Sequence, residues 1–180
     1  MARLPIPTPD TAPAAARPLL DAVNAKLGVI PNMFRLIANS PAGLEAVLGL
    51  NGALGKTLDV KTRERIALAV AAVNGCDYCM SAHTYLGLNL AKLDEAEVAA
   101  NRLGRSNDAK ADAAIGFARK VAEARGKVSG ADVSAVKLAG YTDAQVVEIV
   151  LVVAENFLTN LVNNVAETDI DFPVVTARAA

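Results

Sequence analysis

Aromatic residues and net charge are both scarce in this chain of 180 residues. It has no tryptophan, only four phenylalanines and three tyrosines, and a formal net charge of −1. This near-neutral balance provides no electrostatic footprint for nucleic acid or an anionic membrane, so neither is expected as a partner. Hydrophobic residues still make up 53% of the chain. Alanine, leucine and valine must therefore fill the core, which favours helices that approach one another closely.

Targeting and membrane signals are also missing from the sequence. Residues 1–18 contain Arg3 and Arg17 but no apolar core, so they lack the pattern of a signal peptide. No uninterrupted apolar segment reaches the roughly 18 residues of a membrane span, and Glu148 interrupts the apolar residues 146–153. We therefore expect a cytoplasmic protein. In that reducing compartment a Cys-x-x-Cys pair is more often redox-active or metal-binding than a structural disulfide.

Strand signals are absent, because no stretch alternates apolar and polar residues between hairpin turns. Helix signals recur instead: Asp59 precedes an apolar run, Asn74-Gly75 is a helix stop, and Thr142 begins a capping box. Prolines make residues 1–17 an extended arm, followed by a single helical domain over residues 18–180. The sequence predicts an all-α fold, with one helix opening at Pro31 and others near residues 19–27, 41–55, 60–74, 76–90, 95–103, 108–126, 133–139 and 143–166.

Two segments of the sequence share a faint similarity. Residues 64–71 and 148–154 each begin with a glutamate and continue into an apolar run, which in the first segment starts after Arg65. Apolar helices resemble one another easily, so the similarity alone has little weight. It leaves open a bundle of two pseudo-equivalent halves, of which only the first has cysteines.

The only two cysteines and the only histidine lie within eight positions, as Cys76, Cys79 and His83. On a helix they occupy positions i, i+3 and i+7, which form one stripe. A thiol pair beside an imidazole can carry redox or nucleophilic chemistry. Two alternatives stay open: the cysteines are small buried apolar residues, or the three residues bind zinc with Glu64 or water as the fourth ligand. Structural zinc sites usually have four Cys or His ligands, and no second pair exists here, so redox chemistry is favoured.

Glu64 is the carboxylate that we expect to orient His83. If the two central helices fold back on each other, Glu64 lies ~15 Å before the turn and His83 ~10 Å after it. The difference is about one helical turn, which long side chains or one water can bridge. The alternative is an ion pair of Glu64 with Arg63 or Arg65 at the helix start. An oriented His83 would take the proton of a thiol whose pKa the helix N-terminus already lowers.

Glu64, followed by Cys76-x-x-Cys79-x-x-x-His83, resembles the core of the carboxymuconolactone decarboxylase and alkyl hydroperoxidase D (AhpD) family. The resemblance runs from about residue 28 to 173. Its C-terminal part, Asn156-Phe157-x-Thr159-Asn160 with Asp171-Phe172-Pro173, is similar to the peroxidase-related branch. The resemblance implies an AhpD-like helical bundle, a homo-oligomer, and an antioxidant enzyme that reduces hydrogen peroxide or alkyl hydroperoxides.

The same resemblance implies a role for each residue of the motif. Cys79 would be the peroxidatic nucleophile, Cys76 the resolving thiol, and His83 and Glu64 the proton relay. Peroxide would oxidise Cys79 to a sulfenic acid that condenses with Cys76 to a disulfide. An external dithiol would then restore the pair, and neither a cofactor nor a metal is implied.

Tyr78 departs from the family pattern, because the hydroperoxidase D motif has a second histidine just before the nucleophile. This leaves the reductant open, and we expect Tyr78 to pack rather than to donate to peroxide. A stripe of asparagines on the last helix is expected to make a helix or subunit contact rather than to line a pocket: Asn156, Asn160, Asn163 and Asn164.

Other functions are compatible with the motif. A non-redox decarboxylase-like enzyme is one, although that branch of the family usually lacks the cysteine pair. A redox sensor, or a helical oligomer without turnover, is the other. Catalytic consumption of peroxide with a dithiol separates the enzyme from both.

Overall fold

Helices account for all the regular structure in residues 2–177, the part of the chain that this computed structural model describes. No β-strand occurs in that range, and the all-α prediction is confirmed. The elements are the short 3₁₀ helix η1 (Ala14–Ala16) and the α-helices α1 (Arg17–Leu27), α2 (Asn32–Ile37), α3 (Pro41–Leu54), α4 (Val60–Asn74), α5 (Asp77–Asn89), α6 (Glu95–Arg102), α7 (Ala109–Glu123), α8 (Gly130–Leu138) and α9 (Asp143–Ala166).

Side-chain caps determine where several of these helices begin. Ser40, Asp59 and Thr142 each accept a hydrogen bond from a main-chain N–H in the first turn of α3, α4 and α9. Such a cap pairs an N–H that the helix itself leaves free and contributes about 1 kcal/mol. The predicted starts of these helices are confirmed, including the capping box between Thr142 and Gln145.

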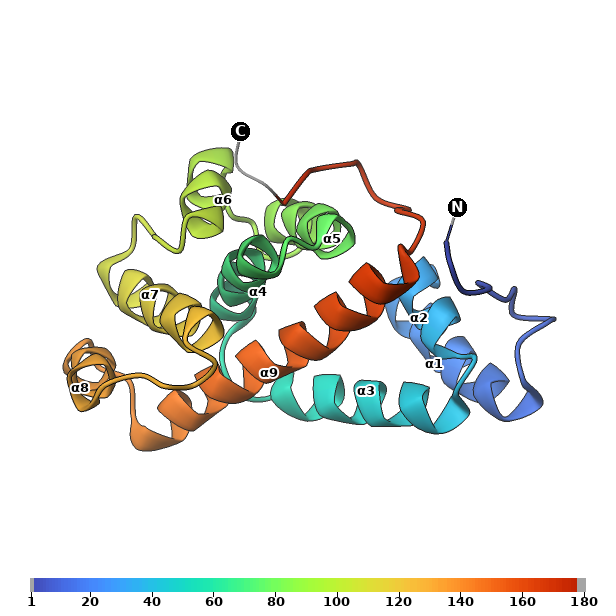
Figure 1. Ribbon diagram of the computed structural model, residues 1–180, viewed down its shortest axis with the longest axis horizontal. Helices are drawn as coiled ribbons and strands as arrows, with labels where there is room; N and C mark the ends of the chain where they lie inside the picture. The colour runs from blue at the N-terminus through green and yellow to red at the C-terminus, as the bar shows by residue number, and fades with distance from the viewer. Residues whose placement is uncertain (1, 178–180) are drawn as a thin grey trace.

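α4 lies at the centre of the molecule (Figure 1) and packs against α5, α6, α7 and α9. Its residues 66–71 are all buried, as expected for a helix that is apolar on every side. Small side chains such as Ala67 and Ala71 let the neighbouring helices come close. This central position makes α4 a rigid support for the side chain of Glu64 in its second turn.

The turn at Gly75 returns the chain along α4. Gly75 ends α4 in the left-handed backbone region, with φ of 62°, where residues that have a side chain are strained. The next helix, α5, begins at once and packs against α4. The predicted helix stop is therefore correct, and the resulting hairpin brings the first half of α4 opposite the middle of α5.

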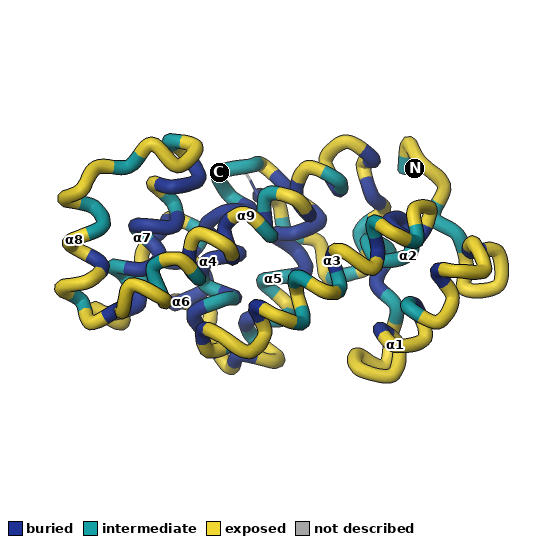
Figure 2. The backbone as a smooth tube through the Cα atoms, turned by 90° about the horizontal axis from the view of Figure 1, so that it is seen from below, coloured by how far each residue is buried: buried dark blue, intermediate teal, exposed yellow. Residues whose placement is uncertain are grey.

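α9 is the longest helix and runs diagonally across the molecule (Figure 1). One of its faces packs inward and the other is exposed, so buried and exposed segments alternate along it in Figure 2. By length and mean hydropathy alone, α9 could cross a membrane, a test that the core helix of a soluble protein also passes. Its uninterrupted apolar runs are short because two glutamates and four asparagines break them. The cytoplasmic location and the pseudo-equivalence of α4 and α9 stay predictions.

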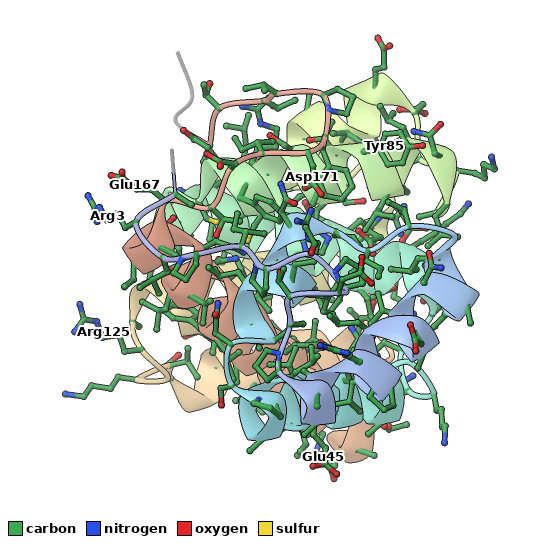
Figure 3. The ribbon with its side chains drawn as sticks, turned by 90° about the vertical axis from the view of Figure 1, so that its right-hand side faces the viewer. Arg3, Glu45, Tyr85, Arg125, Glu167 and Asp171 are labelled. Carbon is green, nitrogen blue, oxygen red and sulfur yellow. The ribbon has the colours of Figure 1, made fainter. Side chains whose placement is uncertain are left out.

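Both terminal segments lie against the helices. Arg3 donates from its main-chain N–H to the carbonyl of Ala166, and its side chain pairs with Glu167 (Figure 3). Residues 168–177, here called the C-terminal strap, pass over α5 toward α6 (Figure 1), where Arg102 donates to the carbonyl of Thr176. The division into an arm over residues 1–17 and one domain over residues 18–180 stays a prediction.

Candidate active site

Cys76 and Cys79 lie at the N-terminal end of α5. Cys76 is the N-cap, and its sulfur accepts a hydrogen bond from the main-chain N–H of Cys79 at 3.3 Å. Both thiols are free, and the two residues are only 0% and 2% exposed. Their neighbours in the core include Leu68, Ala71 and Met80. The helix thus holds both sulfurs away from solvent at the positive end of its dipole.

Glu64 and His83 meet directly across the hairpin. His83 Nδ1 lies 2.8 Å from Glu64 Oε2, and the side chains are 22% and 12% exposed. The predicted contact is confirmed as a direct hydrogen bond. The alternative partners of Glu64 are engaged elsewhere, because Arg65 pairs with Glu97 and Arg63 donates to a main-chain carbonyl at the end of α3.

This hydrogen bond determines which nitrogen of His83 is available for chemistry. An ionised carboxylate can only accept, so Nδ1 carries a proton and Nε2 is the atom that can take up or release another. Burial lowers the pKa of His83, but the charge and hydrogen bond of Glu64, together with Glu155 and Cys76, more than offset burial and raise it. The imidazole is therefore biased toward its protonated form.

Glu155 of α9 is a second carboxylate near His83, which the sequence interpretation did not single out. Burial raises the pKa of Glu155, while a hydrogen bond from Asn51 Nδ2 at 3.0 Å and the charge of His83 act in the opposite direction. The positive charge on His83 is thus stabilised from both α4 and α9. The sequence feature that could have identified Glu155 is a glutamate on a mostly apolar helix.

The two thiols differ in their electrostatic environment. The hydrogen bond from the Cys76 thiol lowers the pKa of Cys79; burial opposes this, and the hydrogen bond from Asn163, together with the nearby polar side chains of Asn160 and Thr159, lowers it further. The same bond to Cys79, together with burial, raises the pKa of Cys76. Cys79 therefore loses its proton more readily, whereas Cys76 keeps its own.

The side chains that stabilise the sulfur of Cys79 come from α9. Asn163 Nδ2 donates to Cys79 Sγ at 3.3 Å across 84 residues of sequence. Asn163, Asn160 and Thr159 are all buried. Thr159 also donates to main-chain carbonyls of its own helix, so its single proton is shared between acceptors. The amides of Asn160 and Asn163 are therefore the principal groups that α9 presents to the thiol.

The asparagine stripe has more than one role. Asn164 Nδ2 donates to the carbonyl of Asn74 at 3.0 Å, which is the helix contact that the sequence interpretation preferred. Asn163 also makes a buried helix contact, because its partner, the sulfur of Cys79, lies on α5; this contact reaches a reactive group that the sequence interpretation had not assigned to the stripe. The spacing of four and three residues between Asn156, Asn160 and Asn163 was the sequence feature that could have shown these amides on one buried face of an apolar helix.

Tyr78 joins three segments of the chain. Its hydroxyl accepts a hydrogen bond from the N–H of Met33 at 3.1 Å and donates to Asp171 Oδ1 at 2.8 Å. Its ring packs edge-on against Phe172 of the C-terminal strap. Burial raises the pKa of Tyr78, so its hydroxyl stays protonated. The two hydrogen bonds and the ring contact make Tyr78 a tether between α5, the start of α2 and the strap, in line with the packing role expected from the sequence.

A zinc site is the alternative that the motif left open. Across the described residues, no three cysteine, histidine, aspartate or glutamate side chains converge in a way that could hold a metal ion. Glu64 points to His83, and Cys79 points to α9. The side chains that would have to bind one zinc ion together therefore point toward different partners.

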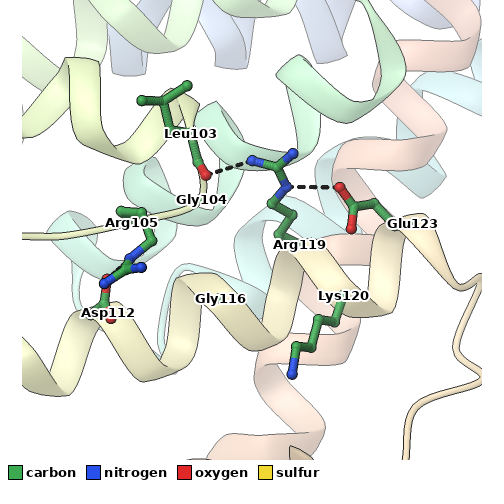
Figure 4. A pocket seen from close by; sticks show the side chains of 8 residues that line it. All are labelled: Leu103, Gly104, Arg105, Asp112, Gly116, Arg119, Lys120 and Glu123. Atoms are coloured by element: carbon green, nitrogen blue, oxygen red, sulfur yellow. Dashed lines mark hydrogen bonds and ion pairs between the residues drawn. The ribbon is translucent and has the colours of Figure 1, made fainter.

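A surface groove of about 450 Å³ lies along α7, away from the cysteines (Figure 4). Arg119 in this groove donates to the carbonyl of Leu103 and pairs with Glu123. Arg105 pairs with Asp112 in the same way. The arginines are therefore satisfied by partners that also line the groove, which contains none of the predicted site residues.

Known proteins share both the motif and the architecture. The carboxymuconolactone decarboxylase family matches residues 41–124, which include the glutamate, both cysteines and the histidine. The crystal structure of an alkylhydroperoxidase AhpD core, an uncharacterized peroxidase-related protein from Ralstonia eutropha JMP134, has a TM-score of 0.83 and 30% identity, covering 94% of this chain and 92% of that chain. The chain belongs to the carboxymuconolactone decarboxylase/AhpD family. The resemblance inferred from the sequence is confirmed, and the family is one of enzymes.

Other relatives of this AhpD-like chain are more distant. A peroxidase-related protein from Silicibacter sp. TM1040 has a TM-score of 0.81 at 24% identity, with 93% and 91% of the two chains covered. The debrominase Bmp8, solved with 2,3,4-tribromopyrrole, has a TM-score of 0.78 at 18% identity, with 94% and 91% covered. These two likenesses concern the fold alone. An uncharacterized protein from Haemophilus influenzae is 58% identical over 36 residues, which are 20% of this chain and span about a third (32%) of that protein.

Proposed function

We propose that the protein is an AhpD-like thiol peroxidase that reduces hydrogen peroxide or alkyl hydroperoxides in antioxidant defence. Cys79 is the nucleophile, Cys76 the resolving thiol, and Glu64 with His83 the proton relay. One observation carries the proposal: two buried thiols whose pKa values shift in opposite directions lie close to an imidazole whose pKa a hydrogen-bonded carboxylate raises. A thiolate, a protonated second thiol and an imidazolium are the three groups that a two-cysteine peroxidase cycle requires.

In the first step the Cys79 thiolate attacks the terminal oxygen of the hydroperoxide. The S–O bond forms as the O–O bond breaks, and the sulfur gives two electrons to the peroxide. The leaving alkoxide takes the proton of the Cys76 thiol and departs as an alcohol. The products are a sulfenic acid on Cys79 and a thiolate on Cys76.

In the second step the Cys76 thiolate attacks the sulfur of Cys79. The S–S bond forms, and the departing hydroxide takes a proton from His83 Nε2 and leaves as water. An external dithiol then reduces the disulfide by exchange and returns both thiols to their reduced form. One turnover therefore converts a hydroperoxide and a dithiol into an alcohol, water and a disulfide, without a cofactor.

The test is a peroxide-consumption assay with several dithiols as reductants. Repeated turnover by the wild type, with loss of turnover in Cys79→Ser, supports a peroxidase. Consumption of one equivalent of peroxide per chain, and no more with any dithiol, indicates a redox sensor. Decarboxylation of a lactone by a variant without either thiol indicates the non-redox alternative. Because a debrominase has this fold, a brominated pyrrole is a further arm of the same assay.

Assembly into a homo-oligomer through the outward face of α9 is part of the proposal. An exposed apolar stripe on that face follows a spacing of four and three residues over about 27 Å of helix. This spacing fits a second α-helix with the same stripe, and an exposed apolar surface of this extent is unusual for a monomer. We therefore assign a second copy of this chain to the stripe, which consists of Val147, Leu151, Ala154, Leu158, Leu161 and Val165.

A further inference from the structure

Two atoms of the α9 amides that face Cys79 have no hydrogen-bond partner within residues 2–177. They are Asn160 Nδ2, a donor, and Asn163 Oδ1, an acceptor. Both residues are almost fully buried, with 0% and 2% exposed. Buried polar atoms are nearly always paired in folded proteins, so two unpaired ones beside a reactive thiol call for a ligand.

The orientation of both amides is set by their other atoms. Asn160 Oδ1 accepts a hydrogen bond from Asn74 Nδ2 at 2.9 Å, which leaves Nδ2 of the same amide for Cys79 or its ligand. Asn163 Nδ2 lies 3.3 Å from Cys79 Sγ. The nitrogen and oxygen of one amide are about 2.2 Å apart, so Asn163 Oδ1 lies within roughly 5.5 Å of the sulfur. A free donor and a free acceptor thus belong to side chains that flank the same sulfur.

We propose that Asn160 and Asn163 form the binding site for the peroxide group of the substrate. A hydroperoxide has one O–H donor and an O–O pair that accepts, which matches one free acceptor and one free donor. Asn163 Oδ1 accepts from the terminal O–H, and Asn160 Nδ2 donates to the inner oxygen. This inference rests on the proposed peroxidase function and extends it to substrate recognition.

The pairing places each oxygen where the chemistry needs it. The terminal oxygen, held by Asn163, is the one that the Cys79 thiolate attacks. The inner oxygen, held by Asn160, becomes the alkoxide, and a fixed N–H donor stabilises the negative charge that develops there. After the O–O bond breaks, the sulfenic acid on Cys79 can donate to Asn163 Oδ1 in place of the substrate.

The experiment compares two reactions of the same thiolate. Iodoacetamide alkylates Cys79 without using an O–O bond, whereas hydrogen peroxide needs both amides. In Asn160→Ala the peroxide rate should fall about 10- to 100-fold relative to the alkylation rate, measured where the thiolate is fully formed. Asn163→Asp keeps the acceptor and removes the donor to sulfur, so it should raise the pKa of Cys79 and leave the ratio of rates near that of wild type.

Controls separate this inference from the fold and from the proposed function. Asn164→Ala removes an exposed amide of the same helix and should keep both rates. Asn160→Asp preserves side-chain size and should show the reduced ratio even where Asn160→Ala does not fold. A wild-type ratio of the peroxide rate to the alkylation rate in both Asn160 variants would overturn the amide site and leave the proposed peroxidase function intact. A wild type that alkylates normally but does not react with peroxide would overturn both.

Discussion

Replacing Glu64 by glutamine removes a charge from the hydrogen bond to His83 and keeps the shape of the side chain. The glutamine carbonyl can still accept from His83 Nδ1, so the imidazole stays in place. Without the charge of Glu64, less remains to offset the effect of burial, and the pKa of His83 falls. Less imidazolium is present at neutral pH to protonate the hydroxide that leaves Cys79, so disulfide formation slows.

The magnitude follows from the geometry of the pair. The nitrogen–oxygen distance is 2.8 Å and both side chains are mostly buried, so water screens the interaction only in part. A hydrogen bond to a charged group contributes about 1.5–3 kcal/mol, and about 1.4 kcal/mol corresponds to a tenfold change. Disulfide formation in Glu64→Gln should be about 10- to 100-fold slower near pH ~7.5. The difference from the wild type should shrink toward pH ~5.5, because a larger fraction of the variant imidazole is protonated there.

Stability should depend on the same interaction. The folded protein raises the pKa of His83 above its unfolded value of about 6.5. The pair therefore stabilises the fold fully below that value, and its contribution is lost as pH rises through the folded pKa. The free energy of unfolding of the wild type should decline over this window, whereas that of Glu64→Gln should be flatter.

Two measurements test the prediction. Rapid mixing with peroxide followed by acid quench and mass spectrometry gives the rate of disulfide formation at each pH, and chemical denaturation over the same range gives stability. Glu45→Gln, which alters an exposed carboxylate on α3 (Figure 3), is the matched control and should follow the wild type. A wild-type pH profile of Glu64→Gln in both measurements would mean that Glu64 does not hold an imidazolium.

Three further predictions concern the other parts of the structure. Mild peroxide should remove two hydrogens from the wild type by mass with no crosslinked dimer, whereas Cys76→Ser should stop at a sulfenic acid on Cys79; retained turnover in Cys79→Ser would reverse the assignment. Tyr78→Phe should lower the free energy of unfolding by about 1–3 kcal/mol, because the main-chain N–H of Met33 loses its acceptor and the Asp171 carboxylate loses one of its donors; an unchanged denaturant midpoint would contradict the tether. Leu158→Glu should turn the oligomer into a monomer by light scattering, and a wild type that is monomeric at micromolar concentration would refute the assembly.

Local signals were sufficient to predict the helices. The caps at Ser40, Asp59 and Thr142 and the left-handed Gly75 each depend on residues within about one turn, so the sequence alone places them. The 3₁₀ helix at residues 14–16 was missed, because three alanines inside a proline-rich arm carry no cap or periodicity that would distinguish a single turn from extended chain.

Contacts within one hairpin were also predictable, and contacts between distant segments were not. Glu64 and His83 lie on two helices joined by a single turn, so the rise per residue is enough to bring them together. Asn163 reaches Cys79 only because α9 packs beside α5. The hydrogen bond from Tyr78 to Asp171 depends in the same way on the path of the C-terminal strap. No local pattern in the sequence encodes either arrangement.

The surroundings of the two cysteines determine which sulfur loses its proton more readily. Cys76 receives a hydrogen bond from the main-chain N–H of Cys79, which favours negative charge on Cys76. The sulfur of Cys79 accepts a hydrogen bond from the Cys76 thiol, which is the largest cause that lowers its pKa, and another from the amide of Asn163; Asn160 and Thr159 lie close enough to lower it further. These side-chain donors to Cys79 together outweigh the one main-chain donor to Cys76. The Cys76 thiol of the motif and the polar side chains of the long α9 helix therefore together make Cys79 the better nucleophile.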